Sequence, residues 1–264
     1  MRAWNRRQRA LGLLLFTAVL LLAVTVSGAL LTDRATAADF SRTNLAPGPD
    51  GLFGTDWLGR DMLSRTLAGL SLSIRIGALT ACVSAVIALA LGVAAALSRW
   101  ADAVLSWLID LFLGIPHILL VMLISLACGR GFLGVVAGVS LSHWPSLARL
   151  VREEVLQLRQ APYLLAAEKL GVPRGQLVRR HLLPHLLPQF LTGLILQFPH
   201  AILHEASVTF LGFGLSSEQP AIGVILSESM QYLTTGRWWL ALFPGLLLVF
   251  VVVLFHFIGD TLSR

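Results

Sequence analysis

The feature that most constrains the fold of this chain is a series of apolar runs of about 20 residues, the length at which an α-helix crosses the hydrocarbon core of a bilayer. Their approximate ranges are 11–31, 72–97, 104–127, 132–150, 186–213 and 238–258. Hydrophobic residues make up 56% of the sequence and charged residues only 13%. These runs predict an all-α membrane protein with six transmembrane helices, and they leave little chain for a catalytic domain on either side.

Clusters of arginine predict the orientation, because loops rich in Lys and Arg stay on the cytoplasmic side. Arginines precede the first run, which is longer than a usual signal-peptide core and is therefore expected to be a retained span. The interval 149–180 carries seven basic and three acidic residues, a local excess of four. We expect both termini in the cytoplasm. Residues 1–70 then hold the N-terminal tail, the first span and an outer connection, and residues 71–264 form a core transmembrane domain whose cytoplasmic loop covers about 152–184.

The sequence lacks the motifs that several chemical functions need. The only lysine, Lys169, follows a glutamate, so the chain has no GxxxxGK[ST] loop to hold nucleotide phosphates. His200 and His204 are four residues apart, but Glu205 follows the pair, which is not the HExxH motif of metalloproteases. His204 and Glu205 would point about 100° apart on a helix and make a poor catalytic dyad. We expect neither an enzyme nor a bound cofactor, and membrane topology explains the basic charge better than nucleic-acid binding does.

The predicted cytoplasmic loop contains AAEKLGVPRGQLVRRHLLP, residues 166–184, in which Gly171 and Pro173 interrupt a helical pattern. Alone, this pattern is also typical of an ordinary amphipathic hairpin. The segment resembles the EAA loop of ABC importer permeases, and the preceding HWPSLARLVREEVLQLRQAPYLLAA is similar to that family's approach to the loop. FGTDWLGRDMLSR, TFLGFGL and PGLLLVFVVVLFHFIGDTL resemble motifs of its dipeptide, oligopeptide and nickel branch. The resemblance runs from about residue 53 to the C-terminus.

This resemblance implies a type I ABC importer permease fold with a cytoplasmic coupling helix, in a bacterial inner membrane and surrounded by lipid. The implied partners are a second homologous permease, two ATP-binding subunits that use the ATP, and a periplasmic substrate-binding protein. Leu165 occupies the position of the glutamate that names the loop, so either Glu168 replaces that acidic contact or the contact is mainly steric. The residues expected to couple this chain to an ATPase subunit are Ala166, Ala167, Glu168, Gly171, Arg180 and Pro184.

Histidines within the apolar runs are the candidate substrate pathway. Ionisable groups in a span usually face a water-filled path or each other, and neutral imidazole suits nickel, copper and zinc. His200 and His204 share one face of the fifth run, and we interpret them as transient metal ligands. A packing role with hydrogen-bonded rings is the alternative for each of these histidines. The full set of predicted pathway residues is His200, His204, Glu205, His117 and His143.

The cargo is the least constrained part of the prediction. The stretches PHAILHEASVTFLGFG and LSHWP resemble the nickel-permease C subunits, so nickel or a nickel chelate is the expected cargo. A dipeptide or oligopeptide importer permease is the alternative, because that group shares the fold and the coupling loop. An intramembrane enzyme and a secondary transporter are less favoured, the latter because no convincing internal repeat is present.

Overall fold

The computed structural model describes residues 6–49 and 51–263, except for the side chains of residues 6–11, 96, 97, 168, 174, 260, 262 and 263. Within this part, the chain is mainly helical, with isolated β-bridges at Gly48–Gly51 and Thr55–Asp61. A 3₁₀ turn covers Phe40–Arg42, and a π-helical segment covers Val178–Leu182. The α-helices are α1 (Arg6–Leu30), α2 (Thr32–Thr36), α3 (Met62–Leu97), α4 (Arg99–Gly114), α5 (His117–Ala127), α6 (Gly131–Arg159), α7 (Pro162–Lys169), α8 (Arg174–Leu177), α9 (Leu183–Phe210), α10 (Ile222–Leu233) and α11 (Trp239–Ser263).

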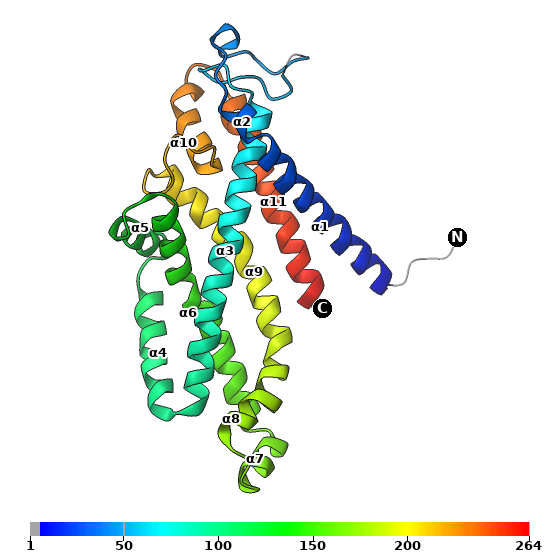
Figure 1. Cartoon of the computed structure of the whole chain (residues 1–264), viewed down its shortest axis with the longest axis vertical. Coiled ribbons are helices and arrows are strands. Elements are labelled where there is room, and N and C mark those ends of the chain that lie inside the picture. Colours follow the sequence, from blue (N-terminus) through cyan, green and yellow to red (C-terminus); the bar gives the residue numbers. More distant parts are fainter. Residues whose placement is uncertain (1–5, 50, 264) are drawn as a thin grey trace, which may run out of the picture.

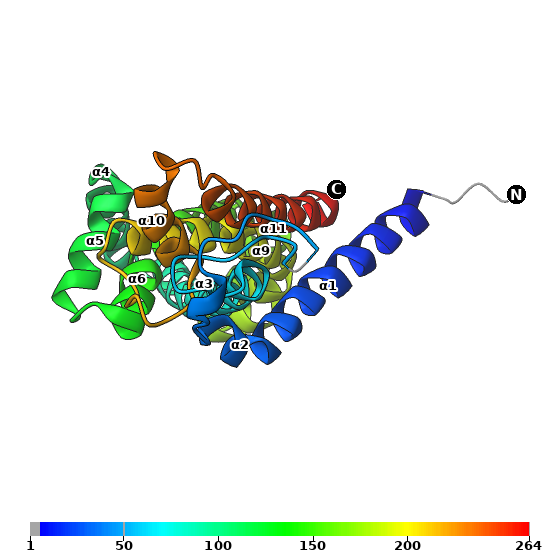
Figure 2. The same ribbon diagram turned by 90° about the horizontal axis from the view of Figure 1, so that it is seen from above.

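The long helices run between two ends of an elongated bundle (Figure 1). One end, which we call the α10 end, holds α2, α10 and the connection of residues 37–61; the opposite α7 end holds α7 and α8. Helices α3, α6 and α11 run toward the α7 end, and α9 runs back toward the α10 end. Helix α1 leans away from the bundle at its N-terminal end (Figure 2). It is held to α3 by Ser71, whose hydroxyl donates a hydrogen bond to the Thr25 carbonyl over 2.7 Å.

Four helical segments in the described part are long and apolar enough to cross a membrane, or five if the bent pair α4 and α5 is counted as one span. The four are Gly12–Leu30, Met62–Ala95, Gly175–Phe210 and Trp239–Gly259. Helix α6, which contains the predicted span 132–150, is not among them. Polar side chains such as Ser140 and His143 lower its hydropathy, and both are buried within the bundle. The multi-pass helical fold is confirmed, whereas the count of six spans is not.

The predicted span at 104–127 is not one continuous helix, because the chain breaks between α4 and α5 with a bend of 98°. Ile115 has an extended backbone, with φ −91° and ψ 135°, and Pro116 follows it. A proline lacks the N–H that a continuing helix needs, and its ring disfavours a helical conformation at the preceding residue. Helix α5 therefore starts afresh at His117 in a new direction.

Buried apolar side chains form three clusters that hold the helices together. One, around Trp144 and Val151, joins α3, α4, α6 and α9. A second, around Ile202 and Leu240, joins α1, α3, α9, α10 and α11. The third, around Val121 and Val139, packs α5 against α6. The apolar side chains left exposed on α1 and α11, including Phe16, are those expected of helices that face lipid.

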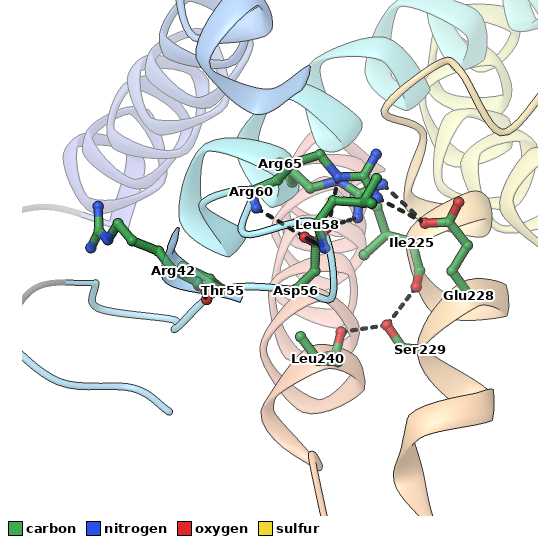
Figure 3. A network of polar contacts seen from close by, with 10 residues as sticks. All are labelled: Arg42, Thr55, Asp56, Leu58, Arg60, Arg65, Ile225, Glu228, Ser229 and Leu240. Carbon is green, nitrogen blue, oxygen red and sulfur yellow. Dashed lines mark hydrogen bonds and ion pairs between the residues drawn. The ribbon is translucent and has the colours of Figure 1, made fainter. Parts of the chain in front are cut away.

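At the α10 end, a buried carboxylate organises the segment FGTDWLGRDMLSR (Figure 3). Asp56 is fully buried and accepts hydrogen bonds from the backbone N–H groups of Leu58 and Arg60, each over 2.9 Å. It also pairs with the guanidinium of Arg60 at 2.7 Å and with that of Arg65 at 2.6 Å. Arg65 reaches across to Glu228 of α10 at 3.0 Å. The network ties α3 to α10.

We predict that Asp56→Asn lowers the thermal unfolding temperature of the purified chain. The change removes a fully buried negative charge that pairs with Arg60 and Arg65, and breaking one side of a buried ion pair costs about 3–5 kcal/mol. Asp33→Asn on α2 is the control, because Asp33 is exposed and a surface change typically alters stability by about 0.5 kcal/mol or less. Equal unfolding temperatures for the two variants would contradict a stabilising role of the network.

Candidate functional site

Three histidine rings from three different helices meet inside the bundle. The ring centroids of His117 on α5 and His143 on α6 lie 4.5 Å apart, and those of His117 and His204 on α9 lie 4.2 Å apart. His143 and His204 complete the triangle at 5.0 Å. One ring nitrogen from each side chain can be chosen so that all three lie within 4.8 Å of one another. Residues predicted separately from three apolar runs thus form one cluster, which we call the histidine cluster.

Backbone hydrogen bonds orient two of these rings. Nδ1 of His143 lies 2.8 Å from the carbonyl oxygen of Val139, and Nδ1 of His204 lies 2.8 Å from that of His200. A carbonyl oxygen can only accept, so Nδ1 carries the proton in both rings, and Nε2 of a neutral ring is left with a free lone pair. His143 Nε2 and His117 Nδ1 are buried and have no hydrogen-bond partner in the protein.

A cavity of about 390 Å³ lies beside the cluster. Its lining follows α6 from His143 to Leu150 and α9 from His204 back to Gly193, so it extends from the histidines toward the α7 end. Four histidines, one serine and one glutamine line it together with three leucines and one glycine. The lining residues are His117, His143, Ser146, Leu147, Leu150, Gly193, Leu196, Gln197, His200 and His204.

Close packing of α5 against α6 brings His117 to His143. A Cβ atom added at Gly138 would lie 2.7 Å from the carbonyl oxygen of Val121, which is closer than real contacts allow. A Cβ atom added at Gly134 would likewise lie 2.7 Å from the carbonyl oxygen of Ser125. The helix break at Pro116 also positions His117, because α5 begins at this residue, at the level of the cluster.

The structure separates the remaining predicted pathway residues from the cluster. His200 is exposed and lines the cavity, but it is outside the set of three converging rings. Glu205 is fully buried, does not line the cavity, and accepts a hydrogen bond from Thr209 over 3.2 Å. Its other carboxyl oxygen has no partner in the protein. The pathway role of Glu205 and the ligand role of His200 remain predictions.

The sequence analysis did not single out Gln197 or Ser146, although both line the cavity. Gln197 is buried and donates hydrogen bonds to the Ser84 hydroxyl and to the His143 carbonyl, each over 3.0 Å, so it joins α9 to α3 and α6. A helical-face count could have found them. The lining positions are 143, 146, 147 and 150 on α6 and 193, 196, 197, 200 and 204 on α9, which is the i, i+3, i+4, i+7 spacing of one helix face.

At the α7 end, the predicted helix–turn–helix is present in a modified form. Helix α7 ends at Lys169, and Gly171 turns the chain with φ +81°, a conformation that favours glycine. A short α8 and the π-helical segment then lead into α9. Leu165 and Leu170 are exposed at 45% and 84%, so this hairpin presents an apolar surface.

The other predicted coupling residues lie in α7, in the π-helical segment and in the first turn of α9. Ala166, Arg180 and Pro184 are exposed, and Ala167 is half-buried against the adjoining apolar cluster. The side chain of Glu168 lies outside the described part of the chain. Whether these residues contact an ATPase subunit stays a prediction.

Two arginines next to the hairpin are paired with acidic residues of α4. Arg152 makes a two-pronged contact with Asp102, at 2.5 and 3.0 Å, and Arg149 pairs with Asp110 at 2.8 Å. The Arg152 pair is partly buried and links the α7 ends of α4 and α6. The basic excess of the interval 149–180 is thus partly balanced by residues outside it.

A bundle of apolar helices around a cavity with polar groups is the architecture of a helical membrane protein that conducts a solute. Residues 86–264 match the model of the family described as "Binding-protein-dependent transport system inner membrane component". The chain belongs to this family of ABC importer permeases, and the resemblance noted in the sequence is confirmed at that level.

Relatives match almost the whole chain. A putative peptide transport system permease protein of Brucella suis biovar 1 (strain 1330) is 34% identical over 261 residues, which cover 99% of this chain and 88% of the relative. The dipeptide transport system permease protein DppC of Bacillus subtilis (strain 168) is 29% identical over 265 residues, covering 99% and 83%. A solved structure titled "Inward facing conformations of the MetNI methionine ABC transporter" shares the fold, with a TM-score of 0.63, 22% identity and coverage of 75% and 94%.

We predict that Gly138→Ala destabilises the packing that brings His117 to His143. The added methyl group meets a backbone oxygen, and overpacking of this kind typically costs about 1–3 kcal/mol. Gly114→Ala is the matched control, because nothing lies within 4 Å of the added Cβ at that helix position. Thermal unfolding of both purified variants measures the difference, and an unchanged unfolding temperature for Gly138→Ala would show that α5 and α6 are not held at this distance.

Proposed function

We propose that this chain is the transmembrane permease subunit of an ATP-driven importer of short peptides. The observation that carries this proposal is the 34% identity, over 99% of the chain, to a protein named as a putative peptide transport permease. DppC of Bacillus subtilis, named for dipeptides, supports the same cargo class. The cavity of about 390 Å³ is compatible with a small solute, since ligand sites typically measure about 300–1,000 Å³.

The proposed orientation places the α7 end in the cytoplasm and the α10 end in the periplasm of a bacterial inner membrane. Basic residues in the interval 149–180 outnumber acidic ones by seven to three. Arg149 and Arg152 are paired with acidic residues of α4, but the other five basic residues still outnumber the three acidic ones, which favours the cytoplasmic side. Arg60 and Arg65 at the α10 end are ion-paired, so they weigh little against this orientation. Both ends of the chain then lie on the cytoplasmic side.

In this proposal, ATP-binding subunits move the permease through the hairpin of α7 and α8. A periplasmic binding protein delivers the cargo to the α10 end, and a second homologous permease supplies the other half of the path. Exposed Leu165 and Leu170 offer an apolar contact where the usual glutamate of the loop is missing. The partner subunits, and not this chain, hydrolyse the ATP.

We predict that Leu170→Asp uncouples transport from ATP hydrolysis. A carboxylate placed in an apolar contact must be desolvated without a partner, and a cost of about 1.4 kcal/mol already weakens docking tenfold. ATPase activity of the reconstituted complex, stimulated by the loaded binding protein, is the measurement. Ala103→Asp is the control, because Ala103 is exposed in the first turn of α4, where a carboxylate is favourable. Full stimulation in the Leu170 variant would place the docking surface elsewhere.

A bulky side chain in the cavity is expected to block the cargo. Ser146 is exposed and lines the cavity, so Ser146→Trp fills part of it without disturbing the buried core. Leu191→Trp is the control on α9, because Leu191 is exposed and does not line the cavity. Uptake of a radiolabelled dipeptide into proteoliposomes should fall toward background for the first variant only. Equal uptake by both variants would exclude this cavity as the peptide path.

Nickel, the cargo that the sequence analysis preferred, is the second candidate. The relatives reported above are named for peptides and dipeptides, so they do not support it. The observation in its favour is the histidine cluster in the cavity wall. Parallel uptake assays with a labelled dipeptide and with radioactive nickel, using the same complex, separate the two candidates: ATP-dependent nickel uptake without peptide uptake would overturn the peptide proposal.

A further inference from the structure

We propose that His117, His143 and His204 form a binding site for one divalent transition-metal ion in the wall of the cavity. Three imidazoles are a donor set that suits zinc, nickel, cobalt or copper. The site rests on the geometry of these rings alone, and it does not depend on which cargo the importer carries.

The protonation pattern of the rings is that of metal ligands. A metal-bound histidine usually donates its other ring N–H to a backbone carbonyl or a carboxylate, which orients the ring and leaves the second nitrogen free to bind. His143 and His204 both donate from Nδ1 to helix carbonyls, of Val139 and His200. Their Nε2 atoms are therefore the nitrogens that remain available.

Ring nitrogens without hydrogen-bond partners argue against a role of the histidine cluster in packing alone. His143 is only 7% exposed, and its Nε2 has no hydrogen-bond partner in the protein. Nδ1 of the half-buried His117 also has no hydrogen-bond partner. An unpaired buried polar atom typically costs about 1–3 kcal/mol. Helix carbonyls hold Nδ1 of His143 and of His204, and a bound ion would satisfy the free nitrogens of all three rings at once.

A small inward movement of the three rings would bring their nitrogens to the spacing of metal ligands. Tetrahedral ligation with metal–nitrogen bonds of about 2.0–2.1 Å places the ligand nitrogens roughly 3.3 Å apart. The three nitrogens here already lie within 4.8 Å of one another. His117 and His204 are half-buried at the edge of the cavity, so their rings have room for the remaining movement. The ring of His143 is buried and held by the Val139 carbonyl, so the other two rings would move toward it.

The fourth position of such an ion would open into the cavity. Three neutral imidazoles leave both positive charges of the ion uncompensated, so an anionic donor such as hydroxide or a carboxylate is favoured there. His200 lines the same cavity outside the set of three and offers a further imidazole close by. A site with three protein ligands and one open position binds and releases a fourth ligand without losing the metal.

Cobalt(II) is the probe for the test, because its visible absorption bands report tetrahedral nitrogen ligation. The full-length chain is purified with an affinity tag that contains no histidine and is titrated in lipid nanodiscs. We expect one cobalt ion per chain, and we expect His204→Gln and His117→Gln each to lower the affinity at least tenfold. Both rings are half-buried, which favours folding of these variants, and thermal unfolding verifies it.

The matched control removes the competing surface pair. His181 and His185 are four residues apart at the α7 end, which is a spacing that can also bind a metal ion. The double variant His181→Gln/His185→Gln should keep the cobalt spectrum and stoichiometry of the unmodified chain. Loss of the spectrum in this control, or cobalt affinity unchanged in both folded His204→Gln and His117→Gln, would overturn the proposal. Peptide uptake is measured independently, so failure of the metal site leaves the proposed function standing.

Discussion

Polar groups buried inside a helical bundle must find their partners within the protein, because burial removes them from water. The Asp56 carboxylate meets this requirement most fully, with two backbone N–H groups and two guanidinium groups around it. The link from Arg65 to Glu228 then fixes α10 against the start of α3. The same requirement makes the exceptions informative: His143 Nε2 is buried without a protein partner, and it lies beside the cavity.

The sequence predicted a large part of this fold, since long apolar runs and breaker residues are local signals. Pro116 was a visible break, yet the apolar residues on both sides outweighed it in the predicted span 104–127, and the structure bends there by 98°. The meeting of His117, His143 and His204 was not predictable. It depends on how closely α5 can approach α6 at Gly138, and this is a property of packing between segments, with no local sequence pattern.

The preference for nickel shows where sequence reasoning was weakest. Members of one permease family share the helices and the coupling hairpin, so motifs such as GTDWLGRD identify the family and not the cargo. In this structure Asp56 and Arg65 of that segment stabilise the α10 end, away from the cavity. In the proposed importer, the side chains that line the cavity contact the cargo, and none of them belongs to this segment.

The hairpin of α7 and α8 is connected through the chain to two walls of the cavity. Helix α6 ends at Arg159 and α9 begins at Leu183, and the hairpin of α7 and α8 joins these two ends. The same two helices carry nine of the ten residues that line the cavity, and only His117 comes from α5. A displacement of the hairpin therefore reaches one wall of the cavity through α6 and the other through the π-helical segment and α9, while the Arg152–Asp102 pair links α4 to α6. Because the histidine cluster joins α5 to both walls, any change in the angle between α6 and α9 must also change the spacing of its three rings.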